Sequence, residues 1–121
     1  MKEKTVKEKS YRFALRLIKA YKFLREERRG FVLSKQWLRS GSAIGALVRE
    51  TEQAQSKADF VNKMNIAFKE ANETEYCLLL LKDSNYIDLK SFQLVHSGCA
   101  KVVKLLISIV KTTKENYASK K

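Results

Sequence analysis

Apolar residues recur along the chain at the three- and four-residue spacing of amphipathic helices, in four segments separated by short polar stretches. We predict helices over about residues 10–28, 34–53, 57–82 and 89–114. The chain has no proline and only four glycines, so little interrupts these segments. The pattern predicts an all-α protein.

Small polar residues mark the expected helix ends. Gly30 is the expected C-terminal cap of the first helix, and Ser34 and Ser56 are expected N-caps. Asp59 follows Ser56 at capping-box spacing, and the polar run KDSNYID (82–88) predicts a turn. Because the connections are short, we expect an antiparallel up-down-up-down four-helix bundle that forms one domain over residues 1–121, with its first and last helices adjacent.

The run RSGSAIGALVRE (39–50) carries two glycines, Gly41 and Gly45, four residues apart. A phosphate-binding loop would need a lysine after the second glycine and a strand before the first, and neither is present. On a helix both glycines share a face with Trp37 and Ile44. Glycine costs about 1 kcal/mol relative to alanine in a helix, so we expect close approach of a neighbouring helix to offset it.

Positive charge is concentrated at the two ends of the chain. The net charge of +12 divides into +7 over residues 1–30, zero over 31–90 and +5 over 91–121. Adjacent first and last helices would join the two excesses into one patch, suited to nucleic acid, to an acidic protein partner, or simply to solubility. The candidate phosphate-binding residues are Lys9, Arg12, Arg16, Lys19, Lys101 and Lys104, with Arg39 and Arg49 as further candidates.

Catalytic and metal-binding candidates are few. Cys77 and Cys99 lie within apolar helical patterns and lack metal-ligand spacing, so we expect reduced thiols in a cytoplasmic protein. We expect His96, the one histidine of the sequence, to be a helix-packing residue rather than a metal ligand or a general base. We expect no catalytic residues, no metal and no cofactor, and therefore not an enzyme. No apolar run approaches the length that spans a bilayer, so we expect no membrane association.

Two carboxylates of the third helix need partners. Glu75 falls on the apolar stripe of that helix, where a structural ion pair is more common than acid catalysis. From the helix-pair geometry we expect Glu75 to face Lys35, and Glu70 to face Arg39 or Ser40.

The run YCLLLL (76–81) makes the third helix apolar on every side. A bundle helix buries one face in its own core, so this run predicts a contact with a second copy of the chain, the alternative being a larger core. The expected interface residues are Tyr76, Cys77, Leu80 and Leu81.

The stretch LRSGSAIGALVRETEQAQSKADFVNKMNIAFKEANETEYCLLLLKDSNYI (38–87), together with KSYRFALRLIKAYKFL (9–24), closely resembles the bacterial four-helix-bundle proteins encoded in intervening sequences of 23S rRNA genes. The shared motifs are S-G-[ST]-x-I-G followed by R-E, then S-K-A-D-F, E-x-x-x-x-E-Y and K-D-x-x-Y-I. Those proteins are similar in turn to the accessory variability determinant protein of diversity-generating retroelements.

The resemblance implies an antiparallel bundle assembled as a ring-like homopentamer with a basic surface and without catalytic residues. For the retroelement relatives it implies binding of nucleic acid and of a reverse transcriptase. Many family members have a charged residue where this chain has Leu79 and Leu80. We therefore expect non-specific RNA or DNA binding, with a scaffold for an acidic partner or a partner enzyme such as a reverse transcriptase as the alternative.

Overall fold

The computed structural model describes residues 2–23 and 31–119, and these residues form helices without any strand. The long helices are α1 (Lys2–Phe23), α2 (Phe31–Glu50), α3 (Lys57–Asp83) and α4 (Leu89–Ser119). A short 3₁₀ helix, η2 (Thr51–Gln53), directly follows α2. The prediction of an all-α protein with four helices is confirmed.

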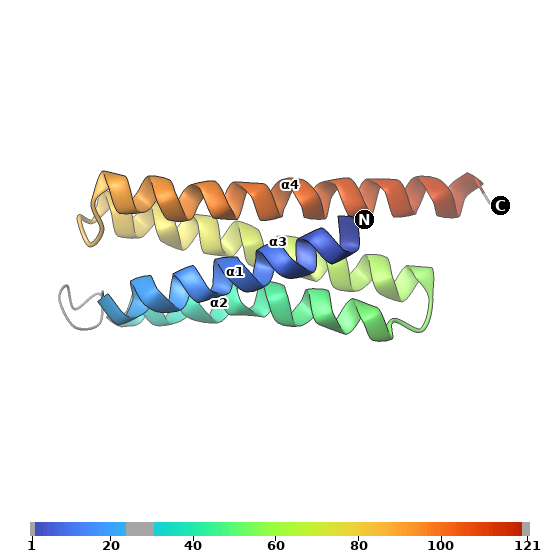
Figure 1. The fold of residues 1–121 in the computed structure, drawn as a ribbon, viewed down its shortest axis with the longest axis horizontal. Coiled ribbons are helices and arrows are strands. Elements are labelled where there is room, and N and C mark those ends of the chain that lie inside the picture. Colours follow the sequence, from blue (N-terminus) through green and yellow to red (C-terminus); the bar gives the residue numbers. More distant parts are fainter. Residues whose placement is uncertain (1, 24–30, 120–121) are drawn as a thin grey trace.

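The four helices lie side by side, and successive helices run in opposite directions in Figure 1. α2 contacts α1 and α3, while α4 contacts α3 and α1. The first and last helices, farthest apart in the sequence, are therefore neighbours. This contact brings the two basic ends of the chain together.

Two predicted helix starts are wrong. α1 begins at Lys2 rather than near residue 10, because Val6 is fully buried and continues the core stripe toward the N-terminus. α2 begins at Phe31, so Ser34 is a buried residue inside the helix and not its N-cap. α4 continues to Ser119, beyond the predicted end at 114. The predicted end of the first helix at 28 and the Gly30 cap lie outside the described residues.

The start and end of α3 agree with the sequence. The Ser56 hydroxyl accepts a hydrogen bond from the Asp59 N–H at 3.0 Å, and the Asp59 carboxylate accepts one from the Gln55 N–H at 3.2 Å. The predicted turn follows α3, with Asn85 at a φ of 64°, in the left-handed region that asparagine tolerates.

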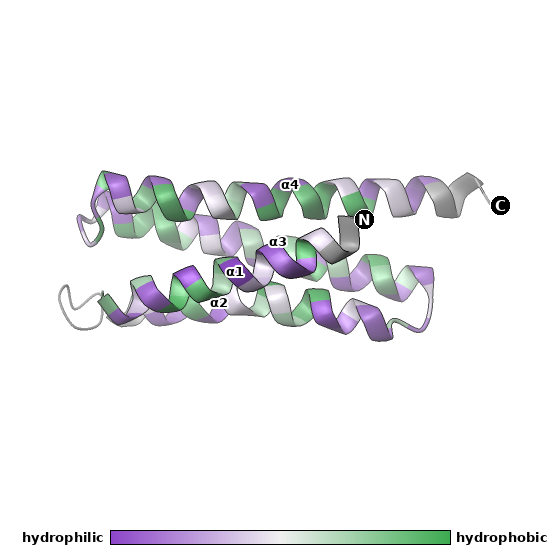
Figure 2. Ribbon diagram, in the orientation of Figure 1, coloured by the Kyte–Doolittle hydropathy of each residue, from purple (hydrophilic) through white to green (hydrophobic). Residues whose placement is uncertain are grey.

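The core lies along the axis of the bundle and takes side chains from every long helix. Hydrophobic and hydrophilic residues alternate along each ribbon in Figure 2, as expected for helices with one buried face. The largest fully buried side chains are Trp37, Leu17, Ile44, Met64, Leu78, Leu81, Leu106, Ile109, Val6, Val102 and Thr74.

The two glycines of α2 lie against α1. A Cβ atom at Gly41 would come within 1.9 Å of the Leu17 Cδ1 atom, so the leucine occupies the space that a side chain would need. A Cβ atom at Gly45 would lie 3.7 Å from the Ser10 hydroxyl and 3.8 Å from its carbonyl oxygen, which is ordinary contact. The predicted close approach of a neighbouring helix is therefore confirmed at Gly41, whereas Gly45 has room for a methyl group.

A buried polar contact joins α2 to α3 beside Gly41. The hydroxyls of Ser40 and Thr74 lie 3.0 Å apart, and each also lies within hydrogen-bond distance of a carbonyl of its own helix, Trp37 and Glu70 respectively. Both hydroxyls are therefore satisfied inside the core.

Among the described residues, α4 alone contains a segment, Leu89–Glu115, long and apolar enough by composition to cross a membrane. This differs from the expectation that no segment approaches that length. A core helix of a bundle can meet the same criterion, and α4 packs on α1 and α3.

Candidate functional site

Four cations form a stripe along the outer side of α1. Lys9, Arg12, Arg16 and Lys19 follow one another at intervals of three and four residues, and all four are exposed. The buried residues of this helix, among them Phe13 and Leu17, lie on another side. Helical periodicity therefore presents these charges together to solvent.

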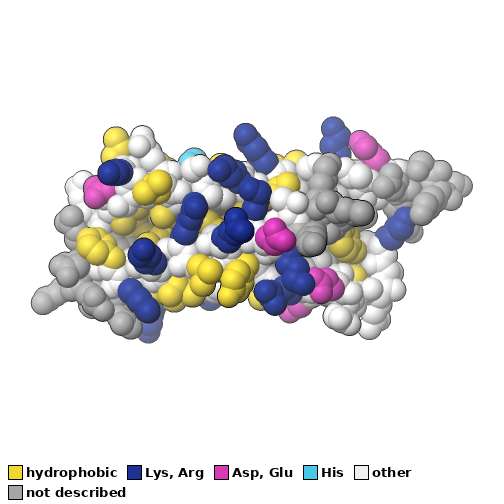
Figure 3. Space-filling view, in the orientation of Figure 1, with side chains coloured by type: hydrophobic (Ala, Val, Ile, Leu, Met, Phe, Trp, Pro, Cys, Tyr) yellow, Lys and Arg dark blue, Asp and Glu magenta, His cyan; other side chains and the backbone are white. Residues whose placement is uncertain are grey.

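Lys101 and Lys104, both exposed on α4, extend the stripe across the helix pair. A Cβ atom at Gly98 would lie 3.3 Å from the Phe13 ring and 3.7 Å from an Arg16 guanidinium nitrogen, so Arg16 crosses the surface of α4 at that glycine. Because the two helices run in opposite directions, Lys101 and Lys104 follow Gly98 toward the Arg12 and Lys9 end of α1. Figure 3 shows the resulting gathering of Lys and Arg side chains on this face.

We call Lys9, Arg12, Arg16, Lys19, Lys101 and Lys104 the basic surface. The ion pairs of the described residues lie elsewhere and involve Lys7, Lys63, Lys82, Arg39 and His96. The cations of the basic surface are thus exposed and without a carboxylate partner within the described part of the chain. Such charges are available to an external polyanion.

Arg39 lies in a different environment, between α2 and α3. Its guanidinium lies 3.0 Å from both Glu73 carboxylate oxygens and 3.5 Å from Glu70, which confirms the expected proximity of Glu70 and Arg39. Gln36 donates a further hydrogen bond to Glu73 at 2.9 Å. The Gln36 and Arg39 hydrogen bonds lower the pKa of Glu73, and the Glu73 hydrogen bond raises the pKa of Arg39. Arg39 is therefore held by carboxylates and lies apart from the basic surface.

Arg49 lies at the contact between α2 and α1. Its guanidinium is 5.5 Å from the centre of the Tyr11 ring, a cation–π contact between α2 and α1. Of the eight predicted phosphate-binding residues, six lie exposed on α1 and α4, Arg49 lies against Tyr11 of α1, and Arg39 is paired with carboxylates of α3.

Glu75 pairs with His96 rather than with the predicted Lys35. The His96 Nε2 atom lies 3.0 Å from a Glu75 carboxylate oxygen, joining α4 to α3. Phe92 stacks on the histidine with ring centroids 5.1 Å apart, and the Lys82 ammonium lies 4.6 Å from the Phe92 ring centre. Glu75 therefore faces α4, on the side of α3 away from Lys35.

The predicted interface run 76–81 divides between the surface and the core. Tyr76 is 63% exposed, and Leu79 is the other exposed residue of the run. Leu80 is half-buried. Cys77 and Leu81 belong to the core of the chain itself, where a second copy could not reach them without rearrangement. The prediction is therefore wrong for those two residues.

Both cysteines are free and buried. Burial raises the pKa of the Cys99 thiol to about 12 and raises that of Cys77 as well. In the described part of the chain, no group of three or more His, Cys, Asp or Glu residues is arranged to hold a metal ion.

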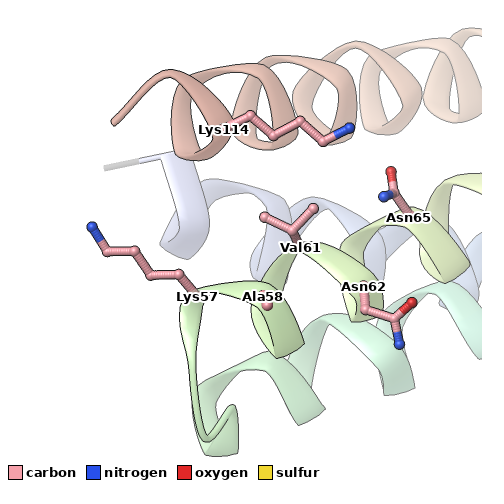
Figure 4. A pocket seen from close by; sticks show the side chains of 6 residues that line it. All are labelled: Lys57, Ala58, Val61, Asn62, Asn65 and Lys114. Atoms are coloured by element: carbon pink, nitrogen blue, oxygen red, sulfur yellow. The ribbon is translucent and has the colours of Figure 1, made fainter. Parts of the chain in front are cut away.

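Grooves lie at both ends of the helix bundle. One, of about 330 Å³, lies between α3 and α4 and is shown in Figure 4, where Val61 and Asn65 point toward α4. Its lining residues are Lys57, Ala58, Val61, Asn62, Asn65 and Lys114. A larger groove of about 500 Å³ lies at the other end, between the end of α1 and the start of α4. We call it the end groove.

The end groove continues the basic surface, because Arg16 and Lys19 line it. The other lining residues are Ala20, Phe23, Tyr86, Ile87, Asp88, Ser91, Leu94 and Val95. The sequence does not predict this groove, because its lining residues come from two stretches, 16–23 and 86–95, that are far apart along the chain. The available signal was the exposed aromatic Phe23 among the cations of α1.

Comparison with known proteins gives the same architecture. A model of the family described as 23S rRNA-intervening sequence protein matches residues 2–108, and a search of curated proteins finds no match. The chain is similar to a crystal structure at 1.70 Å resolution of a protein of unknown function, of the S23 ribosomal protein family, from Bacteroides thetaiotaomicron. The two share 55% identity with a TM-score of 0.90, over 92% of this chain and 99% of that one. The chain therefore belongs to the family of 23S rRNA-intervening sequence proteins.

Proposed function

We propose that this chain is a non-enzymatic, oligomeric helical bundle that binds RNA or DNA without sequence specificity through its basic surface. The observation that carries the proposal is the presence of six exposed cations, without carboxylate partners in the described residues, on two adjacent helices. Lysine and arginine contacts to phosphates hold a nucleic acid without reading its sequence. The buried free thiols are compatible with the reducing cytoplasm, where we place the protein.

The expected binding is strongly dependent on salt. Each phosphate neutralised on duplex DNA contributes about −0.9 to the slope of log K against log salt, so six contacts give a slope of about −5. Affinity should then fall roughly 10³-fold between 50 and 200 mM salt. Binding that is insensitive to salt would contradict an electrostatic interface.

A charge-matched pair of variants tests the location of the site. Arg12→Gln/Arg16→Gln removes two charges from the basic surface, while Lys35→Gln/Lys69→Gln removes two exposed charges from α2 and α3. In fluorescence anisotropy titrations the first variant should bind more weakly, with a slope less steep by about 2, and the second should behave like wild type. Equal losses in both variants would show that only net charge matters.

We further propose that the up-down-up-down bundle assembles as a ring-like homopentamer, the state implied by its resemblance to the family. A ring requires each copy to present two different complementary surfaces. Exposed apolar side chains form two such sets: Tyr11, Leu15 and Ile18 on α1, and Tyr76 and Leu79 on α3. Exposed apolar clusters of this kind are typical of protein contacts.

Light scattering tests this assembly. Leu15→Glu and Tyr76→Glu should each give smaller species than wild type, because each blocks one of the two surfaces. An equimolar mixture of the two variants should form dimers, since each variant retains the surface that the other lacks. A monomeric wild-type protein at micromolar concentration would contradict the proposal.

A second candidate function is a scaffold that docks an acidic partner or a partner enzyme such as a reverse transcriptase. The α1 apolar residues Tyr11, Leu15 and Ile18 occupy positions next to those of the cationic stripe on the same helix, and this combination also suits a protein interface. Association with a purified partner that survives nuclease treatment would favour the scaffold. Association that nuclease abolishes would favour nucleic-acid binding.

A further inference from the structure

We propose that the end groove binds unpaired bases of single-stranded nucleic acid, with a base stacked on Phe23 and phosphates held by Arg16 and Lys19. This inference rests on the proposed nucleic-acid function and adds to it a preferred form of the ligand. The basic surface alone would bind any polyanion, whereas a groove with an exposed aromatic ring favours strands whose bases are accessible.

The shape of the groove suits a flat apolar group. Its volume of about 500 Å³ falls in the range of sites that hold small organic groups. Ile87 and Val95 are buried, whereas Phe23 and Leu94 are 52% and 62% exposed. Two large apolar side chains thus remain open to solvent at a concave site, and a stacked base would cover them.

The charge of the groove suits a phosphate chain. Arg16 and Lys19 line it, and neither has an ion-pair partner within the described residues. Among the described residues that line the groove, Asp88 alone is acidic, and its carboxylate accepts a hydrogen bond of 2.7 Å from the Ser91 N–H at the start of α4. The Asp88 carboxylate thus interacts with the N-terminus of α4, where the helix dipole favours a negative charge.

The residues along α1 can contact both the phosphates and a base of single-stranded nucleic acid. Arg16, Lys19 and Phe23 stand at helical spacing, so two cations and then an aromatic ring follow one another on one side of the helix. The stripe of Lys9 and Arg12 continues away from the groove and can follow the phosphates of the same strand. A duplex keeps its bases stacked and paired, so it can use the cations but not the ring.

The experiment measures binding of a fluorescently labelled uridine decamer and of an abasic strand with the same number of phosphates. Wild-type protein should prefer the decamer. Phe23→Ala should weaken decamer binding by about 5- to 150-fold, the effect of losing one stacked base, and should leave abasic binding unchanged. Phe23→Leu should show the same loss, and Phe23→Trp should retain binding.

The matched control is Ile107→Ala, which removes a similarly exposed apolar side chain (49%) of α4 outside the end groove and should bind like wild type. Circular dichroism checks that each variant is folded. If Phe23→Ala binds the decamer as wild type does, or if Phe23→Leu retains full affinity, the stacking proposal is overturned. Full affinity in the leucine variant would indicate a purely apolar contact, as a peptide segment would make.

The result also separates this proposal from the proposed function. If wild type binds the decamer, the abasic strand and a duplex equally, and all depend on Arg12 and Arg16, the basic surface binds nucleic acid and the end groove does not bind bases. If wild type binds none of the three at low salt, both proposals fail.

Discussion

Replacing Gly41 by alanine should destabilise the bundle, whereas the same replacement at Gly45 should stabilise it. Both glycines lie in α2 and face α1, but their surroundings differ. A Cβ atom at Gly41 would come within 1.9 Å of Leu17, and one at Gly45 would lie 3.7 Å from its nearest neighbour, Ser10. The two substitutions thus add the same methyl group to the same helix with opposite consequences.

The magnitudes follow from two competing effects. Alanine gains about 1 kcal/mol over glycine in helix propensity at either position. At Gly41 the fully buried Leu17 side chain must adopt another rotamer, and overpacking of this kind costs about 1–3 kcal/mol. We expect Gly45→Ala to gain about 1 kcal/mol and Gly41→Ala to lose roughly 0–2 kcal/mol. The gain in helix propensity is the same in both variants. The difference between their free energies of unfolding therefore equals the overpacking cost at Gly41.

Denaturant unfolding followed by circular dichroism measures both free energies, at one protein concentration because the proposed assembly would make stability concentration-dependent. Leu17→Ala, which should cost about 2–5 kcal/mol alone, should cost less in the Gly41→Ala background, because the new methyl group occupies part of the vacated space. Equal or greater stability of Gly41→Ala relative to Gly45→Ala would refute the close approach of α1 and α2.

Three further predictions concern single side chains. The hydrogen bonds from Gln36 and Arg39 hold the pKa of Glu73 below its usual value of 4.5, so their stabilisation is present above pH 4.5 and is lost as the pH falls through the lowered pKa. Glu73→Gln should therefore reduce the loss of stability in acid unfolding curves, and identical curves would contradict this contribution. Ser56→Ala removes the cap of α3 and should cost about 1 kcal/mol in urea unfolding, whereas Ser56→Asp should cost little. Because burial raises the pKa of Cys99 to about 12, its alkylation by iodoacetamide at pH 8 should be slow in the folded protein and fast in urea, and rapid labelling of the native state would contradict its burial.

Much of the fold could be predicted because the apolar periodicity of these helices directly reports which side is buried. The start of α1 could not, because Val6 is the only strongly apolar residue in its first eight positions. Its burial depends on contact with other helices, and the neighbouring Lys7 pairs with Glu52 of η2. Local periodicity contains no information on such partners.

The candidate site shows a similar division. Helical spacing predicted the stripe on α1, and short connections predicted its meeting with α4. The position of Glu75 relative to α2 alone predicts Lys35 as its partner, whereas the rotation of α3 turns Glu75 toward His96 of α4. The end groove depends on how α1 crosses the start of α4, and that geometry is set by packing rather than by spacing along the chain.

The spacing of the two glycines also bears on how the bundle avoids a misaligned state. Gly41 and Gly45 are one helical turn apart, about 6 Å along α2, so α1 could slide by one turn and still place Leu17 over a glycine. Such a slide would carry Phe13 off Gly98, where its ring now lies 3.3 Å from the position that a Cβ atom would take. Gly41 and Gly45 would each accept Leu17, so they do not by themselves fix the position of α1 along the bundle. Gly98 of α4 accepts Phe13 only in the observed position, and it therefore favours that position over the shifted one. The longitudinal position of α1, and with it the placement of the cations relative to α4, therefore depends on α4 as well as on α2.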